Sequence, residues 1–323
     1  MLFRSGSGGK YKALIIHNEA DDFSVGANIG IAMIAAKLKQ YWVIEKMVRL
    51  GQETFKRLKY APFPVVSAPS GKALGGGCEV LLHSSHVQAH AETYMGLVEV
   101  GVGLLPAWGG SAELMSRACG ARKMARGPMP PVAAVFETIS TAKVALSAFE
   151  AKDLFYLRET DGITMNKSRL LFDAKTKALQ MVEGFKAEEP FAMQLPGPSG
   201  LATLATAVDG FYLRGLATPY DVVVSDRVAR VLTGGARADI GIKLTQDYLR
   251  ELERINFMAL ARDPRTLARI ETLLKTGKPL REKPVAGLRA ADLRKGAGET
   301  KDPVNDNGLI RESKPRAGGS GSK

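Results

Sequence analysis

Two glutamates and a glycine triplet have the types and spacing needed for proton transfer beside a stabilised anion. Glu79 closely follows Gly75-Gly76-Gly77, and Glu99 lies 20 residues further on in an apolar run flanked by glycines. Glycines between a strand and a helix let backbone amides approach a ligand, and the helix dipole favours negative charge there. Such a site suits a phosphate or an oxyanion that develops during a reaction.

The two acids differ in their expected environment. Burial in the apolar run would raise the pKa of Glu99, so that it acts as an acid near neutral pH. Two carboxylates near amide donors can hold a water, one acting as base and the other as proton donor. Each feature also has a plain structural explanation: a tight strand-to-helix turn for the glycines, and complementation of the helix dipole for Glu79. The residues support proton-transfer chemistry without identifying a substrate.

The elements that must position these residues alternate between strand and helix. Apolar runs and turn signals predict strands at 14–16, 65–68, 87–89 and 93–96, a long amphipathic helix over 31–59, and helices beginning near 79 and 111. Pro62 and Pro64 end the long helix. This alternation predicts an α/β fold. The strand at 14–16 has no earlier strand to pair with, which suggests missing N-terminal sequence.

The rest of the chain divides by composition. Helices are expected at 142–154, 168–185, 201–216, 219–232, 245–261 and 264–275. We therefore expect a linker-like segment over 1–10, a core with the active site over 11–125, a mainly helical region over 126–280, and a disordered basic tail over 281–323.

Composition excludes several classes of protein. The 323 residues are 45% hydrophobic and 24% charged, as in an ordinary globular protein. No apolar run reaches the roughly 18 residues of a membrane span, and the N-terminus is too polar for a signal peptide. Two cysteines cannot build a disulfide framework, so a reducing, cytoplasmic location is expected. Of the net charge of +12, +5 lies in residues 278–323 (11 Lys and Arg against 6 Asp and Glu), which argues against a nucleic-acid surface.

Three segments together resemble the crotonase (enoyl-CoA hydratase) superfamily: FSVGANI at 23–29, PSGKALGGGCE at 69–79 and GLVEVGVGLLPAWGG at 96–110. The resemblance covers about residues 11–280. It implies a crotonase-like ββα spiral core that lacks its first turn, followed by helices. Downstream motifs are similar to a bacterial subgroup in which the hydratase follows an NAD-dependent 3-hydroxyacyl-CoA dehydrogenase in one fatty-acid oxidation polypeptide.

The resemblance implies a specific reaction, the syn hydration of a trans-2-enoyl-CoA to 3-hydroxyacyl-CoA in fatty acid beta-oxidation. The backbone amides of Val25 and Gly76 would bind the enolate oxygen. Glu79 would deprotonate the water that attacks C3, and Glu99 would deliver a proton to C2. Further substrate contacts are assigned to Phe23, Ser24, Gly26, Ala27, Asn28, Gly75, Gly77, Pro106 and Trp108.

The same resemblance leaves other functions open. An enoyl-CoA isomerase, a CoA-thioester hydrolase and a non-catalytic acyl-CoA-binding or oligomerisation module would share this fold, although the presence of both acids favours hydration. Coenzyme A enters as part of the substrate, and no cofactor is expected. NAD should not bind, because no Gly-x-Gly-x-x-Gly follows a strand. No metal site is expected from His83, His86 and His90. The expected partners are an acyl-CoA, a second copy of the chain or a dehydrogenase domain, and neither nucleic acid nor a membrane.

Overall fold

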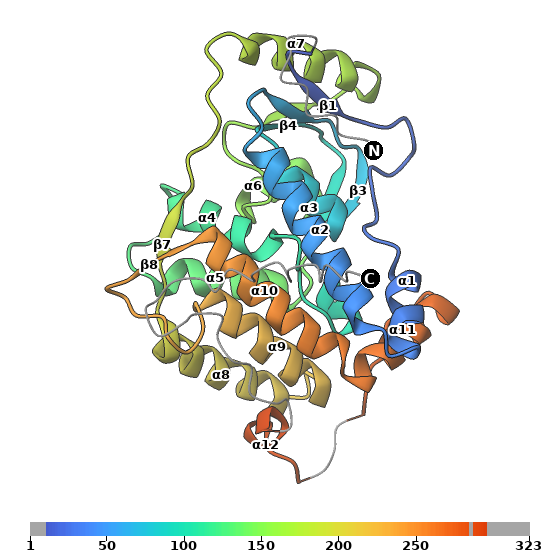
Figure 1. The fold of residues 1–323 in the computed structure, drawn as a ribbon, viewed down its shortest axis with the longest axis vertical. Helices are drawn as coiled ribbons and strands as arrows, with labels where there is room; N and C mark the ends of the chain where they lie inside the picture. The colour runs from blue at the N-terminus through green and yellow to red at the C-terminus, as the bar shows by residue number, and fades with distance from the viewer. Residues whose placement is uncertain (1–10, 284–286, 296–323) are drawn as a thin grey trace, which may run out of the picture.

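A computed structural model describes residues 11–283 and 287–295, and Figure 1 shows their arrangement. The first half of the chain contains β1 (Leu14–Ile16), α1 (Ile29–Lys37), α2 (Tyr41–Lys59), β2 (Val65–Ser67), β3 (Gly71–Leu74), α3 (Gly76–Leu82), β4 (His86–His90), β5 (Thr93–Gly96), the 3-10 helix η1 (Glu99–Val102), α4 (Gly110–Gly120), α5 (Met129–Ser140) and α6 (Ala148–Asp153). The second half contains β6 (Gly162–Thr164), η2 (Lys167–Arg169), α7 (Leu170–Val182), β7 (Ala192–Gln194), α8 (Gly197–Leu213), α9 (Pro219–Leu232), β8 (Lys243–Thr245), α10 (Gln246–Ala261), α11 (Pro264–Thr276) and α12 (Ala290–Lys295).

The largest sheet is parallel, with strand order β1-β2-β4-β6. Its register pairs Leu14 with Val65, Val66 with His86, and Gln88 with Gly162. All three residues of β2 are buried, as expected for a central strand of a parallel sheet covered on both faces. Helix α7 packs against the sheet at one end of the molecule, and α8, α9 and α12 lie at the other end (Figure 1).

A second, two-stranded parallel sheet leads directly into the predicted site. Strand β3 pairs with β5 from Gly71–Thr93 to Leu74–Gly96, so the segments that follow the two strands begin side by side. Helix α3 starts two residues after β3, and η1 starts three residues after β5. This pairing brings Glu79 and Glu99 together although they are 20 residues apart in the sequence.

Two predicted helices differ in the structure. The helix expected over 31–59 is two helices, α1 and α2, because Lys39 adopts a φ of 55° and a left-handed residue cannot continue a right-handed helix. Of the helix expected over 142–154, only the part that forms α6 is helical. Helix α5, which lies before it, is not predicted by the sequence. Ala142 has a φ of 51°, and the side chain of Ser147 caps α6 by accepting from the amide of Glu150.

The region expected to be mainly helical also supplies strands. β6 completes the first sheet, and β7 pairs antiparallel with β8. The boundary expected at residue 125 therefore does not separate the sheet from the helices. Helix α9 begins as its sequence predicts, with Thr218 and Asp221 forming a reciprocal capping box and Pro219 in the first turn.

Part of the segment expected to be a disordered tail is ordered. Helix α12 contacts α8 and α9, and Ala290 within it is buried. The expectations for residues 1–10 and 296–323 lie outside the described residues. In the described part of the chain, no helix combines the length and the apolarity that crossing a membrane requires.

Candidate active site

Glu79 is held in a buried position by backbone amides. Its side chain lies in the first turn of α3, and the residue is 2% exposed. Its Oε1 accepts hydrogen bonds from the amides of Trp108 and Gly110, each at 2.9 Å. Amide donors favour the ionised form of a carboxyl group. Both of these donors meet Oε1, so Oε2 accepts from neither of them.

The glycine pair Gly109-Gly110 in this turn has no room for side chains. A Cβ at Gly110 would lie 2.8 Å from Glu79 Oε1, and a Cβ at Gly109 would lie 2.7 Å from Nε2 of His83. Gly109 also has a φ of 100°, in the left-handed region that favours glycine. From the sequence alone, this pair is expected only to open a helix. The doublet before Ser111 was the signal from which the donor role could have been inferred.

Glu99 differs from Glu79 in having few hydrogen-bond partners. It opens η1, and its Oε2 is buried with no hydrogen-bond partner in the described part of the chain. A Cβ on Gly75 would lie 3.3 Å from Glu99 Oε1, so Gly75 gives this carboxyl its space. Burial raises the pKa of Glu99 from its ordinary 4.5 to about 7. Glu99 can therefore carry a proton near neutral pH.

The two carboxyls influence each other. Burial raises the pKa of Glu79 well above its usual value, and the charges of Glu99 and Glu253 raise it further. The amides of Gly110 and Trp108 act in the opposite direction. Like charges in one buried site resist simultaneous ionisation, so the pair can share a single proton.

The predicted oxyanion donors lie in two adjoining segments. Ser24 bridges to Ala73 in parallel fashion, which places the 23–28 loop beside the end of β3. A Cβ built on Gly26 would lie 3.4 Å from the amide nitrogen of Gly76. Neither the amide of Val25 nor that of Gly76 donates to an acceptor in the described residues. Two neighbouring unpaired amides are what an oxyanion site requires.

Trp108 covers the predicted oxyanion donor Gly76. A Cβ on Gly76 would lie 2.6 Å from Cζ3 of its ring, and one on Gly51 of α2 would lie 2.2 Å from its Nε1. Phe55 meets the ring edge-on, with centroids 5.5 Å apart. The half-buried ring of Trp108 thus packs against its neighbours, and the backbone amide of the same residue donates a hydrogen bond to Glu79.

The other predicted substrate contacts occupy varied positions. Phe23 and Pro106 are buried, Ala27 is exposed, and Gly77 leaves no space between α3 and Ser24. Asn28 caps α1, its side chain accepting from the amide of Gly30 at 3.0 Å. The structure gathers the loop at 23–28 and the glycines around the two acids, while Phe23 and Pro106 belong to the packing beneath them.

We expect Gly76→Ala to damage the site through Trp108. The added methyl would force the ring to move, and the ring's backbone amide holds Glu79. Overpacking of this kind typically costs about 1–3 kcal/mol. Thermal unfolding should show a lower Tm, and any acyl-CoA reaction of the chain should slow at least about tenfold through the displaced donors. Gly210→Ala is the matched control: the added methyl meets nothing within 4 Å, so activity should stay unchanged, and Tm should hold or rise slightly because alanine favours the helix. Equal effects of the two substitutions would contradict the expectation.

A polar cluster behind the site was not predicted. Glu113 is 1% exposed and contacts Nζ of Lys59 at 2.5 Å and a guanidinium nitrogen of Arg250 at 2.9 Å. His83 Nε2 lies 3.7 Å from the same carboxylate, and its Nδ1 lies 2.7 Å from the carbonyl oxygen of Glu79. Burial lowers the pKa of His83 to about 4, so its ring is neutral. In the described residues, no group of three His, Cys, Asp or Glu side chains is placed to hold a metal ion.

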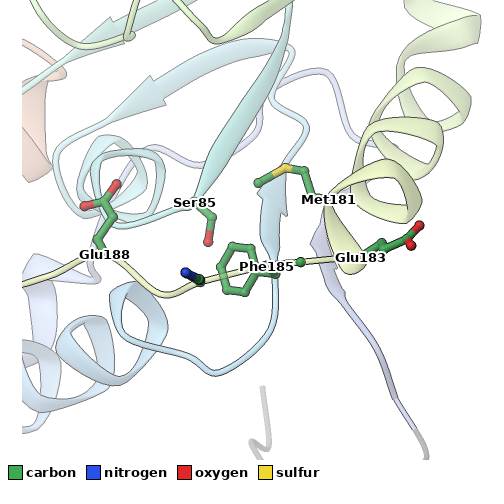
Figure 2. Close-up of a pocket in the computed structure, with 7 residues that line it drawn as sticks. Ser85, Met181, Glu183, Phe185 and Glu188 are labelled. Carbon is green, nitrogen blue, oxygen red and sulfur yellow. The ribbon is translucent and has the colours of Figure 1, made fainter.

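Two pockets lie apart from these acids. One, of about 330 Å³, is lined by Ser85 and by the segment that follows α7, including Phe185 and Glu188 (Figure 2). Glu188 pairs there with Arg158 at 2.8 Å. A second pocket, of about 590 Å³, lies between the end of α4 and β7. No predicted site residue lines either pocket.

Comparison with known proteins identifies the family. The sequence model of the enoyl-CoA hydratase/isomerase family matches residues 6–127. A Bacillus subtilis protein named as a 3-hydroxyacyl-CoA dehydrogenase is 37% identical over 274 residues, which are 84% of this chain and 34% of that protein. A Rickettsia felis protein named as a fatty acid oxidation complex trifunctional enzyme is 30% identical over 265 residues, or 82% of this chain and 33% of that protein. The chain thus spans about a third of the length of these curated relatives.

Solved structures agree on the fold. A crystal structure of an enoyl-CoA hydratase from Rhodobacter sphaeroides superposes with a TM-score of 0.56 at 16% identity, covering 87% of this chain and 83% of that one. The α/β fold with a helical C-terminal region is therefore the crotonase fold, as the sequence motifs predict.

Proposed function

Because the chain carries a domain of the enoyl-CoA hydratase/isomerase family, we propose that it adds water to a trans-2-enoyl-CoA and forms 3-hydroxyacyl-CoA. The observation that carries the proposal is the unequal pair of acids. Oε1 of Glu79 accepts from two backbone amides, whereas Oε2 of Glu99 is buried without a hydrogen-bond partner in the described residues and the pKa of Glu99 is raised. An acid and a base side by side are what the addition of H and OH to neighbouring carbons requires.

In the proposed reaction, Glu79 takes a proton from a water molecule as the water oxygen forms its bond to C3. The electron pair of the C2–C3 double bond moves toward the thioester carbonyl, so that negative charge develops on that oxygen. Glu99 then gives its proton to C2, and the carbonyl re-forms. The proton that Glu79 has gained equals the one that Glu99 has lost, so exchange between the two acids or with solvent resets the site.

The amides of Val25 and Gly76 would stabilise the thioester oxygen in this scheme. Neither amide donates to an acceptor in the described residues, so both are available to bind the oxygen. Removing one donor from an oxyanion site in other enzymes raises the barrier by about 2.7–4 kcal/mol. Both donors are backbone groups, which a side-chain substitution cannot delete. Their contribution depends on the glycine conformations that hold the two segments together.

We further propose that the chain is the hydratase part of a larger protein that also carries a 3-hydroxyacyl-CoA dehydrogenase. The relatives from Bacillus subtilis and Rickettsia felis support this, since their names refer to that dehydrogenase and to a trifunctional fatty acid oxidation enzyme. The dehydrogenase would oxidise the 3-hydroxyacyl product, so placing both activities on one polypeptide would shorten the path between them.

A two-substrate assay tests the proposed reaction. Purified protein is incubated with a 2-enoyl-CoA and separately with a 3-enoyl-CoA. Loss of the conjugated enoyl-thioester absorbance and formation of 3-hydroxyacyl-CoA from the 2-enoyl substrate are the expected results. Conversion of the 3-enoyl substrate to the 2-enoyl product without hydration would identify an isomerase, and release of free CoA would identify a hydrolase. Either result would overturn the proposal.

A further inference from the structure

A third buried acid, Glu253, holds the other side of the turn that binds Glu79. It lies on α10, is fully buried, and accepts hydrogen bonds from the amides of Gly109 at 2.9 Å and Ala112 at 2.8 Å. The described residues give it no ion pair. A carboxylate without hydrogen bonds is too costly to bury, so these two amides account for its presence in the core.

Four of the amides in residues 108–112 are divided between two acids. Those of Trp108 and Gly110 point to Glu79, whereas those of Gly109 and Ala112 point to Glu253. The turn is thus fixed from both sides. Movement of the turn away from α10 would carry the donors of Glu79 with it.

Neighbouring contacts keep α10 itself in place. Arg250, one turn before Glu253, pairs with Glu113 of α4 and with Asp247, and its carbonyl oxygen accepts from the side chain of Gln52. These contacts join α10 to both α4 and α2, so Glu253 presents its carboxylate from a fixed support.

We propose that Glu253 is a positioning residue, which orients the Glu79 carboxylate by holding the 108–112 turn. The expected effect on kcat rests on the proposed function. The expected effect on the 108–112 turn does not depend on the reaction. Glu253 touches no predicted substrate group, so its loss should lower kcat and leave KM nearly unchanged.

The test compares Glu253→Gln with a matched substitution elsewhere. Glutamine has the same shape, but it keeps only one acceptor oxygen for two amide donors. Asp161→Asn is the control, because Asp161 is also a buried carboxylate that accepts two backbone amides, from Val87 and Arg158. We expect kcat to fall about 10- to 100-fold in Glu253→Gln, as a displaced catalytic group implies, and to change less than about twofold in Asp161→Asn.

A double substitution separates positioning from general destabilisation. If Glu253 acts through Glu79, adding Glu253→Gln to Glu79→Gln should lower the residual kcat by less than about twofold. The proposal would be overturned if Glu253→Gln lowered kcat by the same factor in the wild type and in Glu79→Gln. Should Glu253→Gln fail to fold, Glu253→Asp keeps a carboxyl group on a shorter side chain and should show the same pattern.

Amide hydrogen exchange makes the test independent of catalysis. The amides of Trp108 and Gly110 are not bonded to Glu253, yet they should exchange at least about tenfold faster in Glu253→Gln and remain unchanged in Asp161→Asn. Unchanged exchange would reject the positioning role even in an active enzyme. A wild-type protein that does not hydrate enoyl-CoA would reject the proposed function alone, and the exchange rates would still decide this inference.

Discussion

Replacing Glu79 with glutamine should reduce kcat by about 10²- to 10⁴-fold, the usual contribution of a general base. The amide oxygen of glutamine can still accept from Trp108 and Gly110, so the fold and the acyl-CoA affinity should be preserved. What is lost is the ability to take a proton from water. Hydration of a 2-enoyl-CoA measures kcat, and calorimetry with a saturated acyl-CoA measures binding.

The control for this substitution is again Asp161→Asn, which changes a buried carboxylate outside the predicted site. It should retain kcat within about twofold whatever its effect on Tm. If Glu79→Gln matched the wild type in an active protein, Glu79 would not be the base. A loss that appeared entirely in KM would assign it to binding instead.

Replacing Glu99 with glutamine should stabilise the protein above neutral pH while it removes the proton donor. The folded state raises the pKa of Glu99 from 4.5 to about 7, so the folded state binds this proton more tightly than the unfolded chain does. The resulting stability is fully present below pH 4.5 and is lost as the pH rises to about 7. At about 1.36 kcal/mol per pH unit, the wild type should lose about 3 kcal/mol that the neutral glutamine does not lose.

Urea unfolding at a series of pH values tests whether the stability difference between Glu99→Gln and the wild type grows as the pH rises. The free energy of unfolding of Glu99→Gln should exceed that of the wild type by about 3 kcal/mol at pH 8, and the difference should vanish near pH 4. Activity should show the opposite order, with the variant about 10²- to 10⁴-fold slower. A stability difference that does not change with pH would mean that the carboxyl of Glu99 titrates normally.

The sequence motifs identified the centre of the site because its chemistry depends on local spacing. Strand β3, the glycine turn and α3 follow one another within twelve residues, so Gly76 and Glu79 could be placed without knowledge of the tertiary fold. Glu99 could be recognised for a related reason, because an acid within an apolar, glycine-flanked run is not expected to lie on the protein surface. Amphipathic spacing and proline signals likewise predicted most of the helices, α9 through α11 among them.

Features set by distant packing escaped the sequence analysis. Nothing near Glu253 indicates that it meets Gly109, because the two are 144 residues apart and the contact depends on how α10 docks on α4. The break between α1 and α2 was missed because the apolar sequence of α1 and the amphipathic sequence of α2 both form helices, and Lys39 gives no signal for a left-handed turn. The strand β6 is only three residues long, and its pairing with β4 rather than its composition defines it.

The contact between Glu253 and Gly109 also bears on the order in which the molecule assembles. The two residues are 144 positions apart, so forming this contact closes a long loop of the chain. Closing such a loop costs conformational entropy. On the ribosome, the sheet, Glu79 and Glu99 are all synthesised before α10 emerges. A nascent chain that has reached only residue 245 would hold both acids without the support behind their turn. Catalytic competence should therefore be acquired late, when residues 246–261 dock onto a core that is already formed.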